Sequence, residues 1–199
     1  VILEDDPYGD LRFNGEFIPP IKSMDTEGRV IYSKTFSKTL APGIRVGYVT
    51  APKEIISKII VCKQVSDVHT NIWGQVLANK FLETCDIDEH LAKLRVIYKK
   101  KCELMLKGLE ENLSSKIKYT KPDGGLFIWC TLPAGSDMMA FSKKAVEEHK
   151  VAVVPGNAFL VDESAKSTSF RINFSTPTDE QIVRGCEILG KLSKEMFGE

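Results

Sequence analysis

Apolar residues recur along the chain in two patterns, one typical of strands and one typical of helices. Short apolar runs bounded by turn residues predict strands at residues 1–3, 30–33, 45–49, 126–132, 151–154 and 169–174. Apolar residues three or four positions apart predict helices at residues 53–65, 71–84, 88–112, 138–148 and after Thr178. Strands that alternate with helices predict an α/β protein.

The predicted helix at 88–112 is the longest element, and its apolar residues form a single stripe. The stripe steps by three or four positions and comprises Leu91, Leu94, Tyr98, Cys102, Met105 and Leu109. Asp86, with Glu89 three positions later, predicts a capping box at its start, and Thr178 with Gln181 predicts another at the last helix. These signals set the start of both helices.

The order of elements divides the chain into two parts. We expect residues 1–85 to form the end of a larger domain, and residues 86–199 to form a smaller α/β domain. The first residues, VILEDD, lie inside a predicted buried strand without a polar lead-in. We therefore expect this chain to be the C-terminal part of a longer protein.

Composition narrows the classes of function. The 199 residues are 43% hydrophobic, enough for a core, and they hold 27 basic and 27 acidic residues. The chain has no excess of basic residues that would indicate nucleic-acid binding. No apolar run is long enough for a membrane span. The five cysteines form no C-x-x-C pair, which predicts reduced thiols in a cytoplasmic protein, and three scattered histidines predict no metal site.

The stretch KTFSKTLAPGIRVGY, from Lys34 to Tyr48, carries the strongest chemical signal. A lysine amine can form a Schiff base with a carbonyl group, and Lys38 is a candidate. Hydroxyls of Thr35 and Ser37 and the fork of Arg45 are groups that grip a phosphate monoester. A phosphate beside a Schiff-base lysine describes pyridoxal phosphate, although a surface lysine remains the alternative.

A second candidate is Arg171, which lies among Phe170, Ile172 and Phe174 in a predicted strand. An arginine in such surroundings needs a carboxylate partner, and its planar fork suits one. The partner could be a substrate carboxylate or, alternatively, an acidic residue in a structural salt bridge.

Four segments, in order along the chain, resemble those of fold-type I pyridoxal-phosphate enzymes of aminotransferase class I/II. TFSKTLAPGIRVGY resembles the family's cofactor-lysine segment, with threonine where a serine is common. EDDPYGDLRF is similar to its D-x-x-Y segment, SFRINFS to its late arginine strand, and KPDGGLFIW to a segment lining its cleft. The branch it resembles contains 2-aminoadipate and aromatic aminotransferases, together with the aminotransferase-like domain of GntR/MocR-type transcription regulators.

The resemblance implies a role for each matched residue. Lys38 would carry pyridoxal 5'-phosphate as a Schiff base, and Arg45 would bind its phosphate together with the hydroxyls of Thr35 and Ser37. Asp5 would pair with the pyridine nitrogen, and Tyr8 would bond the ring hydroxyl. Arg171 would bind the substrate α-carboxylate.

The resemblance also implies a fold and a function. The fold would be the end of a large cofactor-binding domain with a mostly parallel sheet, followed by a small α/β domain. The function would be transfer of an amino group between an amino acid and a 2-oxo acid, by a cytoplasmic homodimer. A sensory domain of a regulator, with DNA bound by a separate N-terminal domain, and a lyase or decarboxylase are the alternatives. The isolated chain is expected to be inactive.

Overall fold

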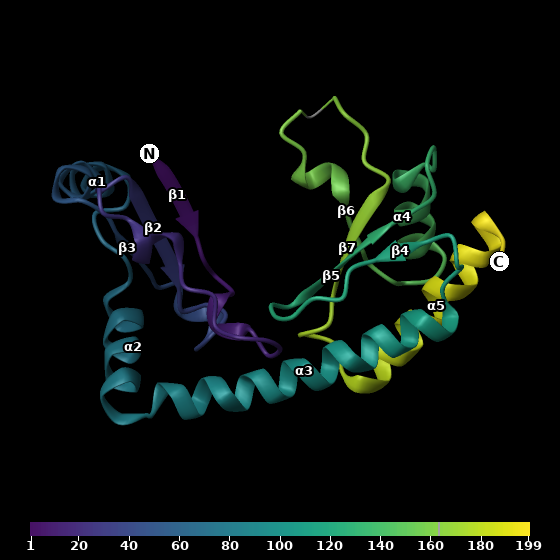
Figure 1. Ribbon diagram of the computed structural model, residues 1–199, viewed down its shortest axis with the longest axis horizontal. Helices are drawn as coiled ribbons and strands as arrows, with labels where there is room; N and C mark the ends of the chain where they lie inside the picture. Colours follow the sequence, from purple (N-terminus) through teal and green to yellow (C-terminus); the bar gives the residue numbers. More distant parts are fainter. Residues whose placement is uncertain (163) are drawn as a thin grey trace. The chain divides into compact units, whose positions relative to one another are not determined.

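The computed structural model describes residues 1–162 and 164–199. They divide into two compact units, Val1–Val96 and Ile97–Glu199, each with its own sheet and helices (Figure 1). The α/β prediction is confirmed. No helix in the described ranges is both long enough and apolar enough to cross a membrane.

The first unit is built on a three-stranded sheet in the order β1 (Ile2–Asp5), β2 (Val30–Thr35) and β3 (Gly47–Thr50). β1 and β2 are parallel, with Asp5 opposite Ser33, whereas β2 and β3 are antiparallel, with Thr35 opposite Gly47. Because β1 and β2 are parallel, their carboxyl ends lie at the same end of the sheet, which is where α/β proteins place their sites.

Burial of the first strand was predicted from its apolar residues, and this expectation is wrong. Val1, Ile2 and Leu3 are exposed over 87%, 48% and 68% of their surface. β1 is an edge strand that pairs with β2 alone among the described strands, and the described elements leave its apolar side chains uncovered.

Three helices complete the first unit: α1 (Lys53–Ser66), α2 (Ile72–Thr84) and the first part of α3 (Ile87–Asn112). Asp86 Oδ1 accepts bonds from the backbone N–H groups of Asp88 and Glu89, which is the Asp86 half of the capping box predicted at this helix start. The carboxylate of Glu89 pairs with Lys93 at 2.6 Å. The short 3-10 turns η1 (Gly9–Leu11), η2 (Ile21–Met24) and η3 (Pro42–Ile44) lie in the connections.

The second unit contains a four-stranded antiparallel sheet in the order β4-β5-β7-β6. Its elements are β4 (Lys118–Tyr119), β5 (Phe127–Thr131), α4 (Met138–Glu147), β6 (Val154–Pro155), η4 (Gly156–Phe159), β7 (Ser169–Asn173) and α5 (Asp179–Phe197). Alternate residues of β5 and β7 are buried, and they form a core with Phe141 of α4.

Two sequence predictions for this unit have different outcomes. The capping box of Thr178 and Gln181 at α5 is confirmed, with both reciprocal bonds present. The strand predicted at 151–154 is shorter than expected, because the N–H of Val151 bonds the carbonyl of Ala145 in α4 rather than a neighbouring strand.

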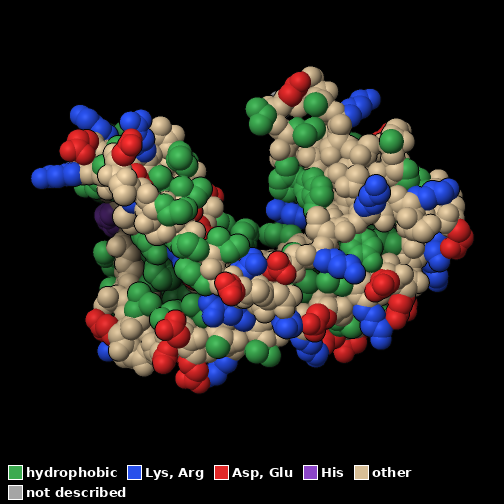
Figure 2. Space-filling model, viewed as in Figure 1, with side chains coloured by type: hydrophobic (Ala, Val, Ile, Leu, Met, Phe, Trp, Pro, Cys, Tyr) green, Lys and Arg blue, Asp and Glu red, His purple; other side chains and the backbone are tan. Residues whose placement is uncertain are grey.

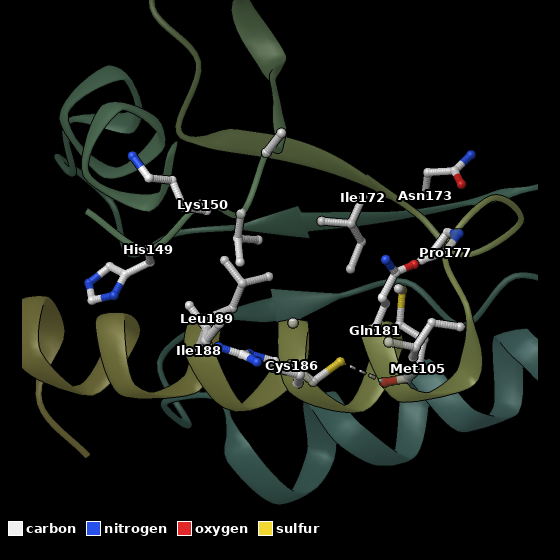
Figure 3. A pocket seen from close by; sticks show the side chains of 15 residues that line it. Met105, His149, Lys150, Ile172, Asn173, Pro177, Gln181, Cys186, Ile188 and Leu189 are labelled. Carbon is white, nitrogen blue, oxygen red and sulfur yellow. Dashed lines mark hydrogen bonds between the residues drawn. The ribbon is translucent and has the colours of Figure 1, made fainter. Parts of the chain in front are cut away.

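A hollow of about 430 Å³ lies within the second unit, between α5, β7 and the segment that follows α4 (Figure 3). Ile172, Leu189 and Cys186 form much of its apolar wall. His149 and Lys150 lie at one end and Asn173 at the other, so polar groups do not converge on one point. This arrangement does not make the hollow a candidate catalytic site.

Candidate active site

The candidate lysine, Lys38, lies on a turn that directly follows β2. The backbone N–H groups of Leu40 and Ala41 both donate to the carbonyl of Phe36, which closes the turn. Lys38 is half-buried, and within residues 1–162 and 164–199 its amine forms no hydrogen bond or ion pair. Lys34 differs, because its amine pairs with Asp10 at 2.8 Å. Of the two lysines in this stretch, Lys38 has the free amine.

The three residues expected to grip a phosphate lie together beside this turn. Thr35 Oγ1 donates to Ser37 Oγ at 3.0 Å, and Arg45 Nη1 donates to the same oxygen at 3.2 Å. Two hydroxyls and a guanidinium offer several donors to one phosphate, so this set fits the phosphate of pyridoxal phosphate. The structure therefore brings Thr35, Ser37 and Arg45 together.

The backbone of Arg45 has an unusual conformation that aims its side chain at this cluster. Its φ of 54° lies in the left-handed region, which non-glycine residues rarely adopt. Arg45 Nη1 also donates to the carbonyl of Pro42 at 3.2 Å. Two residues later, a Cβ on Gly47 would lie 2.7 Å from the carbonyl oxygen of Lys34, so glycine allows β3 to pair closely here. Strained backbone of this kind is concentrated at functional sites.

The two other expected cofactor residues lie at the end of β1. Asp5 is the last residue of β1 and is exposed, and Tyr8 is half-buried just before η1. The neighbouring acid, Asp6, is committed to the fold: it accepts bonds from Gly9 N at 2.7 Å and Tyr32 Oη at 2.9 Å. Burial, together with the bond to Asp6, raises the pKa of Tyr32.

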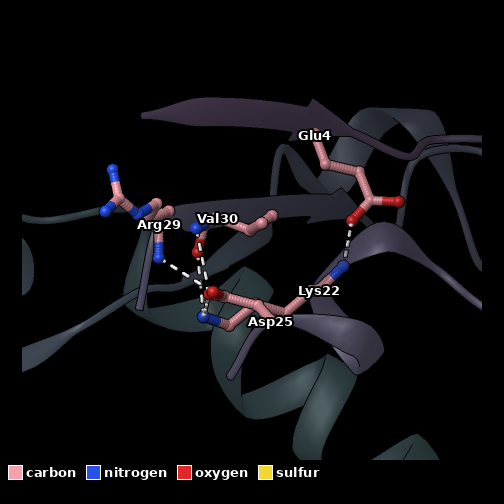
Figure 4. Close-up of polar contacts among 5 residues, drawn as sticks. All are labelled: Glu4, Lys22, Asp25, Arg29 and Val30. Carbon is pink, nitrogen blue, oxygen red and sulfur yellow. Dashed lines mark hydrogen bonds and ion pairs between the residues drawn. The ribbon is translucent and has the colours of Figure 1, made fainter. Parts of the chain in front are cut away.

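A polar network anchors the other end of β2 (Figure 4). Asp25 accepts bonds at 2.9 Å from Lys22 Nζ and from the backbone N–H groups of Arg29 and Val30. The backbone N–H of Lys22 donates in turn to Glu4 of β1. The bond from Lys22, joined by the two backbone bonds, holds the pKa of Asp25 well below its usual range. This network ties η2 to the two parallel strands that end at the site.

Arg171 lies in the second unit, in β7, opposite Trp129 of β5 and Val154 of β6. Its guanidinium carbon is 3.9 Å from the ring centre of Phe127 and 4.8 Å from that of Phe159. Its Nε is buried and has no hydrogen-bond partner among the described residues. The structural salt bridge considered from the sequence is not formed in the described part of the chain.

The two aromatic rings beside Arg171 were not identified from the sequence. Phe127 lies in β5 and Phe159 at the end of η4, 44 and 12 positions before the arginine. Rings stacked on a guanidinium hold its plane by cation–π attraction and leave its N–H edge for a carboxylate. One sequence signal is the segment KPDGGLFIW, which contains Phe127 and leads into β5.

Known proteins share this arrangement of elements. The family model for aminotransferase class I and II matches residues 1–189. Aromatic-amino-acid aminotransferase 1 of Thermococcus litoralis is 45% identical over 195 residues, which are 98% of this chain and 46% of that protein. The structure of a kynurenine aminotransferase from Pyrococcus horikoshii, solved in complex with PMP, superposes with a TM-score of 0.93 at 41% identity and covers 99% of this chain and 48% of its own.

A transcription regulator also matches. The HTH-type transcriptional regulator NorG of Staphylococcus aureus is 30% identical over 181 residues, 91% of this chain and 40% of that protein. The chain spans about half the length of the curated relatives it matches. Since the family model covers nearly all of it, the chain belongs to the aminotransferase class I and II family.

Proposed function

We propose that the whole protein is a pyridoxal-phosphate-dependent aminotransferase that moves an amino group between an amino acid and a 2-oxo acid. The observation that carries this proposal is the free amine of Lys38 on the same turn as the Thr35, Ser37 and Arg45 cluster. Membership of the family and the relatives named above support it.

Each residue of the first unit has a distinct role in this proposal. Pyridoxal phosphate, when bound, supplies the aldehyde and the electron-withdrawing ring that transamination needs. Lys38 Nζ would hold the cofactor, and its amine, once free, would move the proton of the substrate α-carbon, first as a general base and then as a general acid. Asp5 would keep the ring nitrogen protonated, and Tyr8 would bond the ring oxygen.

Arg171 has the complementary role of binding the substrate. Its Nε is buried without a partner, and the rings of Phe127 and Phe159 fix its plane. A substrate α-carboxylate would supply the acceptors that the described chain does not. The aromatic and kynurenine relatives support an amino acid with a large side chain as the substrate class.

Borohydride labelling tests the assignment of the lysine. Reduction of the whole protein with bound cofactor should leave the label on Lys38, and the visible absorbance of the Schiff base should be lost in Lys38→Ala. Lys38→Arg is the matched control, because it keeps the positive charge but cannot form the Schiff base. A label on Lys34 or on another lysine would contradict the proposal.

The regulator NorG favours a second candidate, in which this domain senses an amino acid or the cofactor without turnover. Incubation with an amino donor and a 2-oxo acid separates the two: an aminotransferase forms a new amino acid and a new oxo acid. A lyase or decarboxylase would release ammonia or carbon dioxide instead. DNA binding would depend on a domain other than this one.

The remaining properties are also proposals. We infer that the whole protein is a homodimer in the cytoplasm, and that residues 1–85 belong to the cofactor-binding domain and residues 86–199 to a smaller domain. Five cysteines without a disulfide among them support a reducing compartment. Sedimentation of the whole protein and limited proteolysis of it test the dimer and the domain boundary.

A further inference from the structure

His90, in the first turn of α3, reaches the turn that carries Lys38. Its Nε2 lies 2.7 Å from the carbonyl oxygen of Thr39, which is 51 positions away in the sequence. A carbonyl only accepts, so Nε2 carries the hydrogen and donates it. Thr39 is 5% exposed and is the residue next to Lys38. This bond therefore joins a helix directly to the lysine turn.

The ring of His90 also contacts an aromatic ring of the preceding helix. Phe81 of α2 meets it edge to face, with ring centres 5.1 Å apart and planes at 77°. The next residue, Leu91, is buried and fixes the first turn of α3. Contacts with α2 and the start of α3 thus determine where Nε2 points.

The Lys38 turn has few other anchors on this side. The bonds from Leu40 and Ala41 to Phe36 are internal to the turn and do not fix it against the helices. In the described part of the chain, His90 is the donor found for the Thr39 carbonyl. The direction of the Lys38 side chain depends on the backbone at residues 37–39. Ser37, before the lysine, is bonded to Thr35 and Arg45, and the bond from His90 holds Thr39, after it.

We propose that His90 is a positioning residue for Lys38: its bond to the Thr39 carbonyl holds the lysine turn so that the amine faces the cofactor. The inference rests on the proposed role of Lys38. Its physical part, the fixing of the turn by a side-chain donor, holds whether or not a cofactor binds.

Two variants of His90 separate the hydrogen bond from the ring packing. His90→Phe keeps an aromatic ring against Phe81 but removes the donor. His90→Gln removes the ring but places an amide N–H where Nε2 was. His69→Phe is the matched control, since that ring also bonds a backbone carbonyl, the one of Thr70, in a segment without Lys38.

Hydrogen exchange of the whole protein without cofactor gives the first readout. In His90→Phe, amides at residues 36–41 should exchange about five to ten times faster, the effect of losing one hydrogen bond. In His90→Gln, the same amides should exchange at rates much closer to those of the wild type. In the control His69→Phe, their rates should equal those of the wild type. Borohydride labelling gives the second readout, with slower fixation of the cofactor on Lys38 in His90→Phe and rescue in His90→Gln.

The outcomes are distinguishable. If His90→Phe behaves as the wild type in both readouts while His90→Gln does not, only ring packing matters and the proposal is wrong. Loss of the circular dichroism signal in both variants would show that His90 is needed for the fold as a whole, which also overturns it. If exchange changes as expected but the wild type is labelled at another lysine, the turn is held by His90 and the proposed function fails instead.

Discussion

At the scale of single residues, the main feature of Arg171 is that it has no carboxylate partner among the described residues. Its guanidinium lies against two rings, and its buried Nε has no partner among the described residues. A guanidinium that is partly desolvated in this way gains an acceptor for its buried Nε when a carboxylate binds, because part of the cost of removing its water has already been met in the fold.

We predict that Arg171→Ala in the whole protein raises the KM for the amino acid and leaves cofactor binding near normal. Loss of a charge-assisted bidentate pair costs about 2–5 kcal/mol, which is roughly 30-fold to 4,000-fold in kcat/KM. Steady-state kinetics and titration with pyridoxal phosphate measure the two effects separately. Arg171→Lys is the control that keeps the charge and loses the fork. Its kcat/KM should lie between that of the wild type and that of Arg171→Ala.

The opposite pattern would contradict this division of roles. A variant that lost the cofactor but kept its affinity for the amino acid would make Arg171 a structural residue. Phe159→Leu extends the test, because it removes one ring from the guanidinium while keeping an apolar side chain. A smaller rise in KM is expected from it.

Asp25 gives a prediction about acid stability. Its carboxylate side chain is 3% exposed and accepts from Lys22, Arg29 and Val30. Its pKa in the folded state is depressed, so the unfolded state binds a proton more readily. The contribution of this carboxylate is therefore present above its unfolded pKa, near 4, and is lost as the pH falls below that value.

Asp25→Asn should therefore lower the Tm at pH 7, and the difference from the wild type should shrink below about pH 4. Thermal melts followed by circular dichroism across this range measure it. Asp67→Asn is the control: Asp67 pairs with Lys63 at 2.8 Å on an exposed helix face, so it should change the Tm little. A constant difference between Asp25→Asn and the wild type at all pH values would contradict the argument.

At the scale of elements, the sequence predicts what depends on local chemistry. The spacing of apolar residues identified α1 to α5 to within a few positions, and Thr178 with Gln181 marked the start of α5, because caps and helical stripes are properties of neighbouring residues. The exposure of β1 and the short β6 could not be predicted, since both depend on which strands and helices lie beside them.

The candidate site divides in the same way. Lys38, Thr35, Ser37 and Arg45 lie within eleven positions, so a motif could identify them and the turn brings three of them into contact. The contacts of His90 with Thr39 and of Phe127 with Arg171 join residues 51 and 44 positions apart. Only the packing of helices and strands produces such contacts, and no local pattern predicts them.

The packing of α3, β5 and α5 gives an element-scale prediction through the three cysteines they bury. Burial raises the pKa of Cys130 to about 12 and the pKa of Cys102 and Cys186 to about 11. At pH 8 these three thiols are therefore almost wholly protonated, and the thiolate is the reactive form. Cys62 and Cys85 are exposed to solvent.

A thiol reagent at pH 8 should therefore react quickly with two of the five cysteines, Cys62 and Cys85, and with the others only after unfolding. Mass spectrometry of peptides after brief alkylation identifies them. The variant Cys62→Ser/Cys85→Ser should show almost no fast reaction while it is folded. Fast labelling of Cys130 in the folded protein would mean that the core of the second unit opens readily.

At the scale of the whole molecule, the described chain leaves much apolar surface uncovered. Figure 2 shows hydrophobic side chains at the surface of each unit. In the first unit, large apolar residues that are at least half exposed occur on α1, α2 and the segment between them: Ile60, Val61, Val65, Val68, Ile72, Trp73, Val76 and Leu77. Surfaces of this kind in soluble proteins are usually covered by other parts of the protein or by a partner.

The final prediction is that the 199-residue chain, prepared by itself, self-associates and does not transaminate. Its first sheet has three strands with β1 at an exposed edge, and edges and apolar faces of this kind pair with other copies. The chain also spans about half the length of its relatives. Prepared by itself, it contains Lys38 but nothing that corresponds to the other half of those relatives.

Sedimentation velocity over a range of concentrations, combined with release of oxo acid from an amino donor, measures both parts of this prediction. Trp73→Ser/Val65→Lys should weaken the self-association, because the two side chains are 74% and 84% exposed and contribute nothing to the core. Lys58→Ser, a polar exchange on the exposed surface of α1, is the control and should leave it unchanged. A monomeric chain that binds pyridoxal phosphate and turns over would show that the first unit completes its pocket from residues 1–199 alone.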